Sequence, residues 1–254
     1  VAFYVIIFCI IGYLLMFSRA LIYIYIKITD AAVTMIDTTE APEYSRSTAA
    51  DTSAPSDLPA RIGIRNSAQD YGLLAILLHW LVALVVIAMF TLGVWMTGLS
   101  YYDDWYKRGP DLHKSIGILL FIVMLGRVLW RSINTTPEDE PGISALQRQL
   151  AHTVHLLLYA LLFALMISGY LISTADGKPI HVFDLFAVPA IISDIPNMED
   201  VAGEVHWYIA LTLISLAGLH ATAALKHHFI DRDRTLKKML GIRSSRHNPE
   251  NPDS

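Results

Sequence analysis

Four long apolar segments constrain this chain more than any other feature of its sequence. They cover residues Leu73–Leu99, Leu112–Trp130, 150–175 and Val205–Leu225. A helix needs about 20 apolar residues to cross the hydrocarbon core of a membrane, and all four segments are near or above that length. They are far too long for the strands of a membrane barrel. The sequence therefore predicts an all-α integral membrane protein with a bundle of four transmembrane helices.

The overall composition agrees with a membrane protein and excludes several kinds of site. Of the 254 residues, 54% are hydrophobic and 17% are charged, and the mean hydropathy is +0.45. A soluble domain usually carries about 25% charged residues. The single cysteine, Cys9, excludes an intramolecular disulfide and a cysteine-based zinc or iron–sulfur site within one chain. The ten histidines are therefore the natural candidates for metal chemistry, and the expected surroundings are a lipid bilayer, with no nucleic acid as a partner.

The charges of the connecting segments predict the orientation in the membrane. Acidic residues dominate the connection between residues 176 and 204, and basic residues dominate the chain after residue 225. Because positive segments stay on the cytoplasmic side, we expect the C-terminus inside and the acidic connection outside. The acidic run Glu138–Glu140 then falls on the inner side, but acidic residues count little in this rule. The basic residues that decide the orientation are Lys226, Arg232, Arg234, Lys237, Lys238, Arg243 and Arg246.

The chain outside the core divides into three regions. Residues 1–39 are a further apolar region, interpreted as an extra membrane helix, an uncleaved signal anchor or an artefact of the start site, since the chain opens with Val. Residues 40–70 are expected to be a disordered linker. The four-helix core is expected to span residues 71–228, and residues 229–254 to form a basic cytoplasmic tail. The stretch 226–240 is either an amphipathic helix on the inner headgroups or a solvated tail.

Two histidines on the fourth segment predict a cofactor near each membrane surface. His206 and His220 are 14 residues apart, which is about 21 Å along a helix and just under four turns. Both rings therefore point towards nearly the same face, one near each end. Ligand-competent residues inside membrane segments are rare and indicate function. This arrangement suits two haems stacked across a bilayer.

Depth in the membrane predicts the partner of each ring. With the orientation above, His79 on the first segment lies at the inner depth of His220, and His113 on the second lies at the outer depth of His206. We therefore expect His79 and His220 to bind an inner haem, and His113 and His206 an outer one. Two imidazoles on one iron leave no open axial position, which favours electron transfer over oxygen binding.

Three further residues have alternative interpretations. His152 and His155, at the inner end of the third segment, are candidates for an inner haem ligand, a proton acceptor or a quinone contact, or they are ordinary interfacial residues. Arg127 lies 14 residues after His113 and near the inner surface. It is expected either to pair with a haem propionate or a quinone, or to extend towards lipid phosphates.

The histidine motifs together resemble the bacterial cytochrome b561 family. The resemblance covers roughly residues 70–240 and rests on Leu78-His79-Trp80, Asp111-Leu112-His113-Lys114-Ser115-Ile116-Gly117, Ala151-His152-Thr153-Val154-His155 with Tyr159, His206-Trp207, Gly218-Leu219-His220-Ala221 and Ala224-Leu225-Lys226-His227-His228. It implies a four-helix bundle in the bacterial inner membrane, with two b haems ligated by His79, His113, His206 and His220. It also implies electron exchange with quinone, and one relative oxidises superoxide on the outer side.

The expected function is electron transfer between an external reductant and the quinone pool, with ubiquinone as the partner. The reductant is a small molecule, superoxide included, or a protein. The acidic outer connection repels superoxide, whereas Lys107, Arg108 and Lys114 partly offset that charge. The alternative is a cytochrome b anchor subunit of a larger dehydrogenase or hydrogenase, with the acidic connection as its docking surface. A haem-free transporter is less consistent, because the four segments contain neither Asp nor Glu.

Overall fold

A computed structural model describes residues 63–140 and 142–242 of the chain. The elements are four long helices, α2 (Leu73–Met96), α3 (Trp105–Ser132), α4 (Ala145–Thr174) and α5 (Met198–Lys226), a hairpin of β1 (Ile180–Val182) and β2 (Phe186–Val188), a π-helical turn η1 (His227–Asp231), and a short helix α6 (Thr235–Met239). The expected extra helix within residues 1–39, and residues 40–62 of the expected linker, lie outside the described residues.

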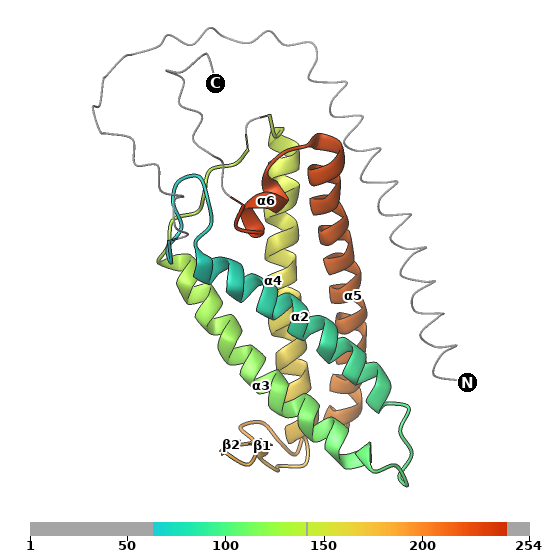
Figure 1. Cartoon of the computed structure of the whole chain (residues 1–254). Coiled ribbons are helices and arrows are strands. Elements are labelled where there is room, and N and C mark those ends of the chain that lie inside the picture. Colours follow the sequence, from blue (N-terminus) through green and yellow to red (C-terminus); the bar gives the residue numbers. More distant parts are fainter. Residues whose placement is uncertain (1–62, 141, 243–254) are drawn as a thin grey trace, which may run out of the picture.

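The four predicted membrane helices are confirmed. Each long helix is apolar enough over its length to cross a membrane, and Figure 1 shows them as a bundle in which α2 lies beside α3 and α4 beside α5, the two pairs crossing obliquely. Large apolar side chains point outwards, as at Leu84 (64% exposed) and Ile87 (55% exposed). Among the described residues, Leu120, Met124, Leu162 and Leu213 form a small buried cluster between the helices. This distribution fits a protein whose outer surface is solvated by lipid.

The helices extend beyond the apolar segments that predicted them. The helix α3 begins at Trp105 rather than Leu112, and α5 begins at Met198 rather than Val205. Glu199 and Asp200 occupy the first turn of α5, where the helix dipole favours acidic residues. At the start of α4, the side chains of Ser144 and Gln147 each accept a hydrogen bond from the other's backbone N–H. Polar residues therefore continue the helices past the apolar core.

The connection between α4 and α5 contains the antiparallel hairpin, which the sequence predicted only as an acidic loop. Ile180 pairs with Val188 and Val182 with Phe186. Ile180 and Val182 are buried against the bundle, where the Ser115 hydroxyl accepts from the Phe183 N–H (3.2 Å) and donates to the His181 carbonyl (3.3 Å). We call this end of the bundle, at the bottom of Figure 1, the hairpin end.

At the opposite end, the chain after α5 folds back onto the bundle. A left-handed residue, Arg232, ends the π-helical turn, and α6 then lies against α2 and the α3–α4 connection. The Trp80 Nε1–H donates to the Met239 carbonyl (2.9 Å), and Lys238 is buried and pairs with Glu140 (2.7 Å). The segment 235–240 is thus neither a free solvated tail nor a long amphipathic helix. We call this the α6 end.

Candidate functional site

At the α6 end, the structure brings together three histidines from three helices. The ring centroids of His79 on α2 and His220 on α5 are 6.4 Å apart, with an angle of 70° between the ring planes. His155 on α4 approaches the same ring of His220, at 5.1 Å. His152, the fourth predicted histidine at this end, is exposed on α4. His79, which the sequence predicted as the partner of His220, therefore faces the His220 ring, and His155 is a second neighbour of that ring.

At the hairpin end, the other predicted pair also meets. The ring centroids of His113 on α3 and His206 on α5 lie 6.2 Å apart, with 69° between the ring planes. The two pairs therefore have nearly the same geometry at opposite ends of α5. The hairpin lies beside this second pair, because its anchor Ser115 is two residues after His113.

The separations within both pairs suit a shared metal ion. A metal–imidazole nitrogen bond is about 2 Å, and the ring centre lies about 1.1 Å behind that nitrogen, so two rings on opposite sides of one ion have centroids about 6.3 Å apart. The observed values of 6.4 and 6.2 Å match this separation. The ring centroids of His155 and His220 are 5.1 Å apart, which is too short for two rings on opposite sides of one metal ion. A haem iron between His79 and His220, and another between His113 and His206, would fit these positions.

Two glycines lie directly against the rings at the hairpin end. A Cβ atom at Gly169 would lie 3.1 Å from His206 Cε1, and one at Gly93 would lie 3.3 Å from His113 Cε1. Ordinary contacts between carbon atoms are about 3.5–4.0 Å, so a larger residue at either position would displace a ring. These glycines leave the space that the rings need, and a flat macrocycle between the rings would need the same space.

Hydrogen bonding fixes the His206 ring in the form that can bind a metal. Its Nδ1 lies 3.0 Å from the Leu165 carbonyl, which can only accept, and 3.1 Å from the Ser168 hydroxyl. The proton is therefore on Nδ1, and the lone pair of Nε2 is free, as in most metal-bound histidines. The Nδ1 of His113 is buried without a partner in the described part of the chain.

At the α6 end, Arg127 connects two of the helices. Its Nε–H donates to the Tyr159 hydroxyl on α4 (2.8 Å), and its Nη2 lies 3.1 Å from Nδ1 of His79. Just before α2, burial raises the pKa of the Tyr71 hydroxyl, and the nearby cation of Arg131 partly opposes this shift. The α6 end therefore carries positive charge close to its histidines, whereas the hydrogen-bond partners of the His206 ring at the hairpin end, the Leu165 carbonyl and the Ser168 hydroxyl, are neutral.

Comparison with known proteins decides the family. The family model described as "Prokaryotic cytochrome b561" matches residues 70–241, which include all four helices and both histidine pairs. The chain belongs to the prokaryotic cytochrome b561 family. It is a multi-pass membrane cytochrome, and b-type haem and electron transport follow from this membership.

Three curated relatives are similar to this chain over much of its length. "Cytochrome b561 homolog 2" of Escherichia coli K12 is 53% identical over 180 residues, which are 71% of this chain and 96% of that protein. "Probable superoxide oxidase CybB" of Yersinia pestis is 33% identical over 174 residues, covering 68% and 96%. "Cytochrome b561 homolog 1" of E. coli K12 is 28% identical over 169 residues, covering 65% and 93%. Each match therefore spans nearly all of the relative and about two thirds of this chain.

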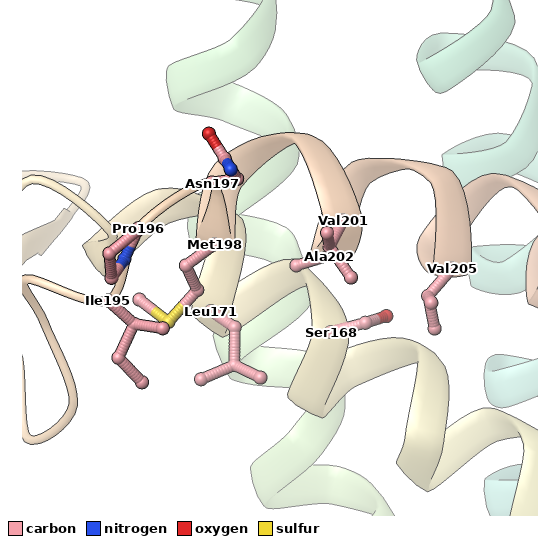
Figure 2. Close-up of a pocket in the computed structure, with 9 residues that line it drawn as sticks. All are labelled: Ser168, Leu171, Ile195, Pro196, Asn197, Met198, Val201, Ala202 and Val205. Atoms are coloured by element: carbon pink, nitrogen blue, oxygen red, sulfur yellow. The ribbon is translucent and has the colours of Figure 1, made fainter.

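The structure adds contacts around the cytochrome's histidines that the sequence did not reveal. Ser168 contacts His206, Gly169 packs on it, and Tyr159 holds Arg127. Ser168 also lines an apolar pocket of about 290 Å³ between α4, the start of α5 and the Ile195–Asn197 connection (Figure 2). Sequence spacing alone does not show which ring Gly169 or Gly93 faces.

Proposed function

We propose that this cytochrome holds two b haems, one between His79 and His220 and one between His113 and His206, and transfers electrons between an external reductant and the quinone pool. The observation that carries the proposal is the repeated geometry: two histidine pairs at opposite ends of α5, separated by 6.4 and 6.2 Å. When bound, haem would supply one-electron chemistry. The chain supplies the ligands, their spacing and the surrounding charge.

We further propose that the α6 end faces the cytoplasm of the bacterial inner membrane. Arg232, Lys237 and the rest of the basic C-terminal segment lie at this end, and basic segments stay inside. The hairpin end then faces outwards and receives the external reductant. Ubiquinone would meet the α6 end, where Arg127 and His155 offer polar contacts inside the bundle.

Superoxide is one candidate reductant. The support comes from the relative named "Probable superoxide oxidase CybB" and from two exposed cations, Lys107 and Arg108, in the first turn of α3 near the hairpin end. A basic surface would steer an anion towards the His113–His206 pair.

A cytochrome b subunit that takes electrons from a protein partner is the second candidate. It is favoured by the acidic connection at the hairpin end, where Lys178 is already neutralised by Asp176 at 2.5 Å. The carboxylates of Glu199, Asp200 and Glu204 remain exposed. A partner with a basic surface would fit them.

Reconstitution in vesicles that contain ubiquinone tests the proposal. With superoxide generated outside, we expect ubiquinol to form, and His206→Ala or His220→Ala to reduce its formation to the rate of empty vesicles. The control is His181→Ala, because His181 is an exposed histidine at the hairpin end that belongs to neither pair. Quinone reduction that survives both substitutions would refute the electron path. Reduction by a purified protein donor but not by superoxide would favour the second candidate.

A further inference from the structure

The connection between α4 and α5 has an apolar middle between charged ends. Residues 180–193 contain one charged side chain, Asp184, whereas Lys178 and Asp194 stand just outside them. The two ends lie together, because the Asp194 N–H donates to the Ala175 carbonyl (3.4 Å). The chain therefore leaves the end of α4 and returns to it. An apolar segment of about 10–14 residues is too short to cross a membrane but is typical of re-entrant or interfacial segments. We call residues 180–193 the apolar loop.

Hydrogen bonds to two helices hold the apolar loop alongside the bundle. The buried hydroxyl of Ser115 on α3 binds the backbone of the hairpin at two points. The hydroxyl of Tyr170 on α4 donates to the Pro189 carbonyl and accepts from the Ile191 N–H, both at 2.8 Å. The loop is thus fixed to α3 near its beginning and to α4 near its end.

Both anchoring residues lie within the apolar parts of their helices. Ser115 is three residues inside the apolar segment that begins at Leu112, which is about 4.5 Å along the helix axis. Tyr170 is five residues inside the segment that ends at residue 175, which is about 7.5 Å. The loop therefore lies beside the outermost turns of two membrane-spanning helices and not beyond their ends. At this depth, about 5–10 Å into the boundary between headgroups and acyl chains, interfacial segments bury their apolar side chains.

The side chains of the apolar loop divide into a buried set and an exposed set. Ile180 and Val182 are buried against the bundle, with 4% and 0% of their surface exposed. Leu185 and Ile191 are each 81% exposed, and Phe183 is 46% exposed. Exposed apolar side chains that lie close together mark contact with a protein or with a membrane.

The helix face beneath the loop decides for the membrane. Leu119 and Ile122 follow Ser115 by four and seven residues, so they lie on the same side of α3. They are 40% and 52% exposed on a membrane-spanning helix, and this side of α3 therefore faces lipid. The exposed apolar side chains of the loop continue this lipid-facing surface towards the hairpin end.

We propose that residues 180–193 form a re-entrant loop that inserts Phe183, Leu185 and Ile191 into the leaflet at the hairpin end, so that lipid covers its exposed face. The hairpin pairing and the two anchors satisfy backbone groups that lipid cannot. The carboxylate of Asp184 limits the depth, because a charge in hydrocarbon is costly. The loop thus stays at the boundary with the headgroups, and the charged ends of the connection remain in water. This inference depends on the membrane-spanning bundle and not on the number of haems.

Spin labels test which medium surrounds the apolar loop. Cys9 is the single cysteine of the chain, so Cys9→Ser provides a background for Leu185→Cys and Ile191→Cys. The haem-loaded full chain is labelled and placed in vesicles of phosphatidylethanolamine and phosphatidylglycerol. Relaxation of each label by oxygen, which concentrates in lipid, is compared with relaxation by a water-soluble nickel chelate. A wild-type visible spectrum of each labelled variant shows that the bundle is intact.

Two control positions calibrate the measurement. Leu84→Cys reports lipid, because Leu84 is 64% exposed in the middle of α2, and Lys178→Cys reports the charged end of the same connection, where the side chain is 79% exposed. We expect the oxygen-to-nickel ratio at Leu185→Cys and Ile191→Cys to match that of Leu84→Cys and to be severalfold above that of Lys178→Cys. A ratio as low as that of Lys178→Cys would place the loop in water and overturn the proposal. Poor access of both reagents would show that a protein partner or a second copy covers the loop, which would also overturn it.

Discussion

Replacing Gly169 by alanine should weaken the hairpin-end haem site selectively. The added Cβ would lie 3.1 Å from Cε1 and 3.4 Å from Nδ1 of His206, so the ring must move by about 0.4 Å or more to reach an ordinary contact. The ring has little freedom to do so, because the Leu165 carbonyl holds its Nδ1 at 3.0 Å. Overpacking of this kind costs about 1–3 kcal/mol, which corresponds to about 5- to 150-fold weaker haem binding.

The assay is competition for haem with an apo-globin, read from the visible spectrum, together with the haem:protein ratio. The control is Gly203→Ala on α5, where an added Cβ meets no atom within 4 Å. Alanine favours a helix over glycine by about 1 kcal/mol, so a loss of haem in Gly169→Ala cannot come from a weakened helix. Wild-type haem affinity in Gly169→Ala, or an equal loss in Gly203→Ala, would refute the reasoning.

Three further predictions concern the surroundings of the two ends. Ser168→Ala removes a hydroxyl beside Nδ1 of His206 and should weaken only the hairpin-end haem, by about fivefold, in the same competition assay. Lys238→Met leaves Glu140 without its cation and should lower the free energy of unfolding by about 3 kcal/mol. Adding Glu140→Leu to this variant should restore most of the lost stability. Thermal unfolding of the two variants measures both effects. Hydrogen bonds from the Ser100 hydroxyl and N–H hold the pKa of Asp103 below its ordinary value. The stabilisation that these hydrogen bonds give the folded protein is therefore present above the ordinary pKa of Asp103 and lost as the pH falls through the lowered pKa. Ser100→Ala should raise the pKa of Asp103, which NMR measures.

The sequence predicted the membrane helices well because their signal is strong and local. The four apolar segments each became a helix, but α3 and α5 begin seven residues earlier than the apolar segments do. Charged and aromatic residues continue a helix into the headgroup region, where hydropathy no longer marks it. The hairpin was missed because its strands have three residues each, too few to show an alternating pattern.

The pairing of the histidines could be predicted from depth alone, since helix rise places each ring at a known height. His79 does lie opposite His220, and His113 opposite His206. The side-chain contacts around them could not be predicted. Whether Arg127 reaches a lipid phosphate or His79 depends on helix rotation, which one sequence does not reveal, and the structure directs it inwards to His79 and Tyr159.

The most direct test of the paired-histidine account is the haem:protein ratio of the purified chain with its reduced-minus-oxidised spectrum. The account predicts two b haems per wild-type chain, and one in each of His206→Ala and His220→Ala, with the retained haem differing spectrally between the two variants. A single haem in the wild type, or two haems retained in either variant, would contradict it.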